Sequence, residues 1–259
     1  MPSRLHRRSP ALTEPVARGF VDFLGGPVGR FAAVGRQRWW TPLRVLILVA
    51  LVFLSFGFLS KARCLEGVRA DDGRVGLDWS GDRQYVAACY NDITPLYGGR
   101  GLDQGGFPYA FSWVEGDLTR YLEYPVLAGL FQWAVAAVTR LTYPLVDATG
   151  LPVAEASWFF ALTALAMSAL WVLAIRLVAD MAGHRIWDVV LVAASPLIIV
   201  HAFTNWDIPS ITLAVAAMHA ASRSRFGLAG LFIGLGTAFK LWPVYLLGAY
   251  LVLALRDRR

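Results

Sequence analysis

One polar stretch of the chain, residues 61–122, holds most of the side chains that could do chemistry, and it lies between two apolar segments. The carboxylates between positions 66 and 123 are Glu66, Asp71, Asp72, Asp78, Asp82, Asp92, Asp103, Glu115, Asp117 and Glu123. Asp82 and Asp92 stand apart because tyrosines and a tryptophan surround them in the sequence. A carboxylate among aromatic rings has a raised basicity and suits a general base. The alternative is an aromatic belt at a membrane interface, with solvated charges around it.

Two further ionisable residues, Asp207 and Lys240, lie at the ends of apolar runs. An ionisable group at such a position is costly and usually faces a polar cavity, where a lysine suits a phosphate oxygen. The alternatives are that Lys240 snorkels to the interface and that Asp207 caps a helix starting at Pro209. Glu123 precedes a Tyr-Pro helix start, where the helix dipole alone explains a carboxylate. His201, six residues before Asp207, is a lesser candidate.

Both cysteines, Cys64 and Cys89, lie in the polar stretch. A disulfide is permitted if that stretch is outside the cytoplasm, and two free thiols are the alternative. The histidines have no metal-ligand spacing and the cysteines form no CxxC motif. We therefore predict no metal site, and neither a phosphate-binding Walker loop nor a GxSxG elbow is present.

The composition indicates a membrane protein, since 57% of residues are hydrophobic and only 16% are charged. The net charge of +6 does not indicate nucleic-acid binding, because eight arginines are concentrated in residues 1–44, before the first apolar run. Such a cluster is typical of a cytoplasmic tail. The prolines and glycines there predict that this tail, residues 1–43, is largely disordered.

The apolar runs cover residues 45–60, 124–139, 157–179, 187–203, 208–221, 226–239 and 241–255. Arginines near positions 176–185, 223–225 and 256–259 place those connections in the cytoplasm, so the polar stretch, the 205–207 connection and the 240–243 junction face outside. The run at 124–139 must then begin and end outside. Gln132, Trp133 and Arg140 fit an interfacial amphipathic helix, and a full crossing is the alternative.

These observations predict an all-α, multi-pass protein of the cell membrane with a cytoplasmic N-terminus. Residues 44–259 form its transmembrane domain, and residues 61–122 form a long first extracytoplasmic loop that contains interfacial helices.

Several motifs in this order resemble the GT-C class of membrane glycosyltransferases: CYNDITPLYGGRGL, PYAF, LEYPVLAG, NWDIPSI and GLGTAFKLWP. More closely, they are similar to actinobacterial mannosyltransferase-like proteins that use polyprenol-phosphate sugars. The resemblance covers about residues 40–255 and implies a GT-C-like helix bundle. It also implies inverting transfer of a hexose, often mannose, from a polyprenyl-phosphate donor to a cell-envelope glycolipid or glycan acceptor in the bilayer.

The resemblance assigns roles to individual residues. Asp92, within Cys-Tyr-Asn-Asp, matches the family's loop aspartate that serves as general base, and Asp82 is its rival because it stands three residues before a tyrosine. Residues expected to contact the donor phosphate or the substrates are Lys240, Asp207, Arg83, Arg100, Glu123, Tyr124 and His201. No resident cofactor is identified, and a divalent cation stays an open alternative.

The chain is shorter than members of this class usually are, which leaves two other hypotheses. One is an inactive fragment of a longer glycosyltransferase. The other is a non-catalytic membrane module, either a transporter or an accessory subunit of envelope assembly. A transporter is expected to have two related halves, and the sequence contains no internal repeat.

Overall fold

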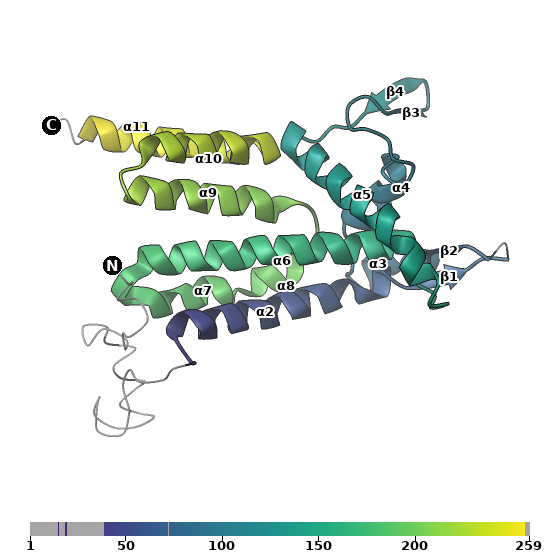
Figure 1. Cartoon of the computed structure of the whole chain (residues 1–259), viewed down its shortest axis with the longest axis horizontal. Coiled ribbons are helices and arrows are strands. Elements are labelled where there is room, and N and C mark those ends of the chain that lie inside the picture. The colour runs from purple at the N-terminus through teal and green to yellow at the C-terminus, as the bar shows by residue number, and fades with distance from the viewer. Residues whose placement is uncertain (1–14, 16–18, 20–38, 72, 257–259) are drawn as a thin grey trace.

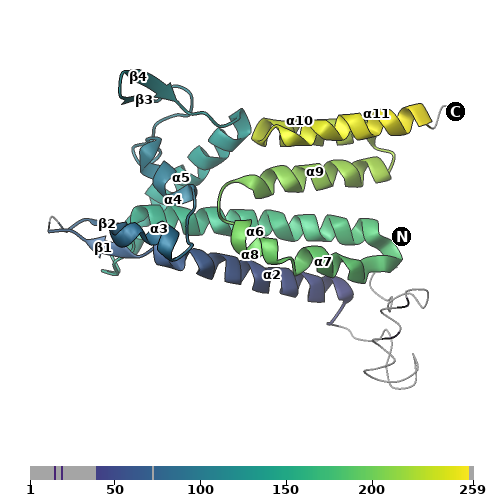
Figure 2. The ribbon, with the colours of Figure 1, turned by 180° about the vertical axis from the view of Figure 1, so that it is seen from behind.

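The computed structural model describes residues 15, 19, 39–71 and 73–256, so most of the predicted tail at 1–43 lies outside the described residues. The helices that run along the long axis in Figure 1 are α2 (Pro42–Lys61), α6 (Glu155–Ala182), α9 (Asp207–Ser222), α10 (Phe226–Phe239) and α11 (Leu246–Arg256). Helices α2 and α10 end where α6 and α9 begin, and residues 62–71 and 73–122 lie at that end (Figures 1 and 2). We call it the loop end.

Helix α2 has the start signal and the length of a membrane span. Thr41 is its N-cap, and the Thr41 hydroxyl oxygen accepts a hydrogen bond from the Arg44 amide at 3.3 Å. Pro42 opens the first turn, where the missing N–H costs nothing. The helix has 20 residues, which corresponds to about 30 Å and to the thickness of the hydrocarbon core. It begins three residues before the predicted apolar run at 45–60.

Three helical segments of the described chain are long and apolar enough to cross a membrane: Pro42–Cys64, Val126–Asp147 and Glu155–Ala193. Shorter apolar helices follow at Phe226–Phe239 and Trp242–Arg256. The central helix is α6, whose buried residues include Phe159, Phe160 and Met167. The prediction of an all-α membrane protein is therefore confirmed.

The loop contains two small antiparallel β-hairpins besides its short helices. Strands β1 (Gly67–Arg69) and β2 (Val75–Leu77) form one hairpin, and β3 (Ser112–Glu115) and β4 (Leu118–Tyr121) form the other. Gly116 and Asp117 form the turn between β3 and β4. Strands of three or four residues are too short for a recognisable alternation in the sequence. The loop helices are α3 (Arg83–Val86) and α4 (Ile93–Gly99).

Helix α5 (Val126–Asp147) is longer than the predicted run at 124–139. It runs obliquely to α6 and crosses the loop end of the bundle in Figures 1 and 2. Its buried residues recur at helical spacing, with Ala128, Gln132 and Ala136 on one face. Helix α5 is long and apolar enough to cross a membrane, so the full crossing and the interfacial helix both stay predictions.

The apolar run at 187–203 does not form the single helix that the sequence predicts. It is divided between the end of a 3-10 segment (Gly183–Val189), α7 (Val190–Ala193) and α8 (Pro196–His201). The break falls at Ser195–Pro196, because proline cannot donate the helical hydrogen bond and disfavours a helical residue before it. Helix α8 packs closely on α2, where a Cβ at Gly57 would lie 3.1 Å from the Ile198 carbonyl oxygen.

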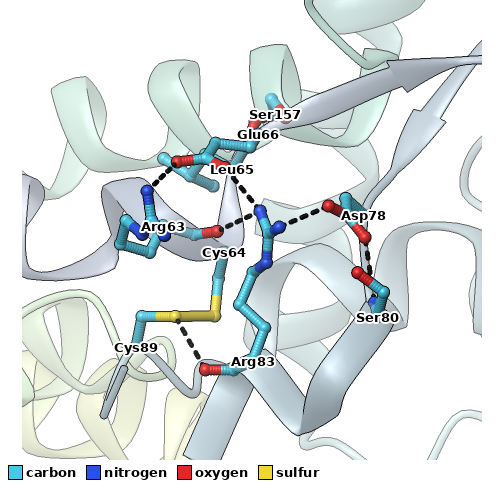
Figure 3. A network of polar contacts seen from close by, with 9 residues as sticks. All are labelled: Arg63, Cys64, Leu65, Glu66, Asp78, Ser80, Arg83, Cys89 and Ser157. Carbon is cyan, nitrogen blue, oxygen red and sulfur yellow. Dashed lines mark hydrogen bonds and ion pairs between the residues drawn. A yellow bond between two sulfur atoms is a disulfide. The ribbon is translucent and has the colours of Figure 1, made fainter. Parts of the chain in front are cut away.

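Covalent and ionic links close the first part of the loop (Figure 3). Cys64 and Cys89 form a disulfide, with their Cα atoms 5.7 Å apart. The Arg83 carbonyl oxygen lies 3.7 Å from the Cys89 sulfur. The Arg83 guanidinium pairs with Glu66 at 2.5 Å and forms a second ion pair with Asp78. Two carboxylates compensate its charge. The role of Arg83 is therefore structural: it links residues 66 and 78 of the loop.

Removing the disulfide is expected to destabilise the protein, because the bond closes a stretch of 25 residues in the unfolded chain. A loop of that size corresponds to about 2–4 kcal/mol. A reductant should therefore lower the unfolding temperature of the wild-type protein in detergent by several degrees, measured by differential scanning fluorimetry. The Cys64→Ala/Cys89→Ala variant should unfold at the lower temperature with or without reductant. Identical unfolding temperatures for the oxidised wild type and this variant would contradict a structural role.

Candidate active site

The Asp92 carboxylate does not cap helix α4, because Asn91, the residue before it, makes the capping hydrogen bonds. The buried Asn91 side chain accepts hydrogen bonds from the Thr94 amide at 2.9 Å and from the Thr94 hydroxyl at 3.1 Å. Asn91 therefore acts as the cap at the start of α4. Asp92 already has helical backbone angles and makes no capping bond. Its carboxylate instead accepts a hydrogen bond from the Tyr90 hydroxyl at 2.6 Å.

The backbone around Asp92 is fixed from two directions. The Asp92 amide donates to the Thr204 carbonyl at 2.7 Å, which joins the loop to the connection between α8 and α9. The Lys61 ammonium, at the end of α2, donates to the Tyr90 carbonyl at 2.8 Å. The disulfide at Cys89 adds a covalent link just before this segment. Asp92 is thus held where the loop meets two parts of the bundle.

Tyr124 and Trp206 line the same region. Their rings meet edge to face with centroids 5.4 Å apart. Burial, followed by the nearby negative charges of Asp92 and Glu123, raises the pKa of Tyr124 to about 12, so its hydroxyl stays protonated at neutral pH. The Trp206 indole N–H and the Asn205 side-chain oxygen are buried and have no hydrogen-bond partner among the described residues. Buried polar groups normally have partners, so these two are available to a ligand.

Arg100 and Glu123 form an ion pair at 2.6 Å, and the Arg100 guanidinium also stacks on the Trp113 ring at 4.2 Å. Helix α5 begins at Val126, and Pro125 precedes it without a side-chain cap. Glu123 precedes the start of α5, as the sequence predicts, and its carboxylate also has the Arg100 guanidinium as an ionic partner.

Asp207 and Lys240 form an ion pair, although they belong to different helix ends. Asp207 is the first residue of α9, and Lys240 follows the last residue of α10. Asp207 makes no capping hydrogen bond, so the capping alternative is wrong. Both helix ends lie at the loop end in Figure 1. The two residues thus share one end of the molecule with the loop carboxylates.

Other predicted site residues lie apart from this group. Asp82 is exposed, has a φ of +51° and makes no ion pair or side-chain hydrogen bond with the described residues. Arg83 is engaged in the loop network described above. His201 is exposed at the end of α8, and its side chain has no polar partner in the described part of the chain.

Lys61 is the residue that sequence reasoning missed. It is only 3% exposed, and within the described part of the chain it has no carboxylate partner. The available signal was that it is one of only two lysines and ends the first apolar run. In the structure the Lys61 side chain is buried and its ammonium donates to the Tyr90 carbonyl in the loop.

A resident metal ion does not fit the described residues. They contain no group of three or more histidine, cysteine, aspartate or glutamate side chains that could hold one. A divalent cation at this site would therefore depend on oxygen ligands from a substrate, such as a phosphate.

The protein is a membrane protein whose apolar helices carry a polar site at one end of the bundle. This site contains a carboxylate, tyrosines and ion pairs. The model of glycosyltransferase family 87 matches residues 121–259, and the chain therefore belongs to this GT-C-type family of membrane glycosyltransferases. The matched part includes Tyr124, Asp207 and Lys240, and it begins after Asp92. No curated protein and no solved structure matches the chain.

Lys61→Met tests whether Lys61 positions the Asp92 segment. The change removes the bond to the Tyr90 carbonyl, and we expect kcat for sugar transfer to fall about 10- to 100-fold with little change in KM. The unfolding temperature should stay the same or rise, because burying an ammonium ion costs roughly several kcal/mol.

Arg63→Gln is the matched control. Arg63 lies two residues after Lys61, and its side chain is exposed, so the change removes one positive charge without touching the Tyr90 carbonyl. It should keep wild-type kcat. Unchanged transfer by Lys61→Met would show that the Lys61–Tyr90 bond does not position the site.

Proposed function

We propose that the protein transfers a hexose, specifically mannose, from a polyprenyl-phosphate donor to a glycolipid or glycan acceptor of the cell envelope. The reaction takes place at the extracytoplasmic membrane surface and inverts the anomeric centre. Family membership supports glycosyl transfer in a membrane. The observation that carries the proposal is the Asp92 carboxylate, which is free of helix capping and fixed at the loop end beside Tyr90.

In the proposed reaction, Asp92 accepts the proton of the acceptor hydroxyl as its oxygen attacks the anomeric carbon. The bond from this carbon to the donor phosphate oxygen breaks, and that oxygen leaves with the electron pair as polyprenyl phosphate. Attack from the face opposite the leaving group inverts the configuration. The Tyr90 hydroxyl holds one carboxylate oxygen, which leaves the other for the acceptor.

Two cations are suited to the departing phosphate. Arg100 is held by Glu123 and Trp113, and Lys240 is held by Asp207. Each carboxylate fixes its cation before the donor binds, so less ordering is needed when the phosphate arrives. The protonated Tyr124 hydroxyl is a further donor close to Asp92. The sequence-based choice of Asp92 over Asp82 is kept, because Asp82 lacks any comparable surroundings.

The first test compares Asp92→Asn with Asp82→Asn in membranes supplied with labelled polyprenyl-phosphate mannose. Asparagine keeps the shape of the side chain but cannot accept the proton, so transfer by Asp92→Asn should fall about 100- to 10,000-fold. Asp82→Asn makes the same change on an exposed loop residue and should keep normal activity. Full transfer by Asp92→Asn would remove Asp92 from the mechanism. A wild-type protein that adds no transfer to that of membranes lacking it would favour a non-catalytic membrane module.

The second test exchanges the charges of the Asp207–Lys240 pair. The two side chains are 37% and 40% exposed, so the pair contributes only about 0.2–1 kcal/mol to stability. Lys240→Met should raise KM for the donor about tenfold, as expected for one lost phosphate contact. The reversed pair, Asp207→Lys with Lys240→Asp, should restore the unfolding temperature but not the donor KM. Recovery of both in the reversed pair would show that the ion pair is purely structural.

A further inference from the structure

A groove of about 640 Å³ runs along α9 between α6 and α10. Its walls are almost entirely apolar, with Leu170, Leu173, Leu177, Leu213 and Phe232 among the lining residues. Leu173 and Leu228 are 44% and 38% exposed, so the groove is open along its side. The volume is in the range of a small-molecule site, and the apolar walls suit a hydrocarbon chain.

The two ends of this groove differ in chemistry. Phe131, Pro209 and Phe239 lie towards the loop end, and they are apolar. Three basic side chains, His219, Arg223 and Arg225, lie at the α9–α10 turn at the other end of the bundle (Figure 1). All the ionisable groups that line the groove are therefore at one end.

The positive charge at that turn is only partly compensated. Asp180 pairs with Arg223 and lies 2.7 Å from the His219 ring nitrogen. Arg225 has no carboxylate partner in the part of the chain that the structure describes. Arg225 also immediately precedes α10, whose N-terminal amides add positive partial charge at the same place. This end of the groove therefore carries a net positive charge that would attract an anion.

We infer that this groove binds an anionic phospholipid, with the phosphate of its headgroup at Arg223 and Arg225 and one acyl chain along α9. The apolar walls and the basic end match the two parts of such a lipid, and basic clusters beside membrane helices attract anionic headgroups. The polyprenyl donor is a poorer match, because its phosphate must reach Asp92 at the opposite end of the bundle. This lipid site is therefore separate from the proposed sugar-transfer site and does not depend on it.

The experiment titrates phosphatidylglycerol into the detergent-purified full chain and counts bound lipid by native mass spectrometry, with phosphatidylcholine as the neutral probe. Phosphatidylglycerol should bind more tightly, and Arg225→Gln should weaken it about fivefold, the effect of one basic residue near a lipid headgroup. Arg44→Gln is the matched control. It removes one charge at the same end of the bundle from α2, which does not line the groove, and it should leave binding unchanged.

A second variant tests the chain-binding part of the groove. Ala216→Trp places a large ring in the groove and should abolish retention of the lipid while the headgroup arginines remain. Equal binding of the two lipids, or equal weakening by Arg225→Gln and Arg44→Gln, would overturn the inference. A polyprenyl phosphate that displaces the lipid and binds Arg225→Gln as tightly as the wild type would also overturn it. So would a dimer in which a second copy of the chain covers the groove.

Discussion

The hydrogen bond from the Asp92 amide to the Thr204 carbonyl is the contact on which the site depends. A long polar loop between membrane helices is held at a fixed place on the bundle only if specific contacts hold it there. This bond joins it to the connection that leads into α9, and the Lys61–Tyr90 bond joins the same segment to the end of α2. The segment between residues 89 and 92 is thus covalently and non-covalently tied to the helices. The position of Asp92 follows from these bonds.

Polar groups at the end of an apolar bundle need partners, and the protein satisfies most of them with each other. Glu123 holds Arg100, Asp207 holds Lys240, and two carboxylates hold Arg83. Some groups near Asp92 lack such a partner, as do other buried groups of the described chain, among them the side chains of Gln132 and Thr163. Lys61 is buried without a carboxylate, and Asn205 and Trp206 keep buried atoms without hydrogen-bond partners among the described residues. A site that awaits a polar ligand is expected to leave such groups unpaired.

Sequence reasoning succeeded wherever a local property decided the outcome. The apolar runs located α2 and α6, which are long and apolar enough to cross a membrane, and they also located the shorter helices α9 and α10. It failed where short-range steric effects interrupt a run, as at Pro196, and where strands were too short to show alternation. The ion pair of Glu123 could not be predicted from local pattern, because its partner Arg100 lies 23 residues earlier.

The sequence by itself determined the membrane class and the place of the polar loop between apolar segments, because composition and periodicity are carried by neighbouring residues. Tertiary structure alone decided which of the charged residues meet. The Lys61–Tyr90 and Asp207–Lys240 contacts join residues 29 and 33 positions apart. The groove along α9 likewise requires three helices to pack with a gap between them. Such contacts depend on the path of the whole chain, since packing brings together side chains that no local pattern links.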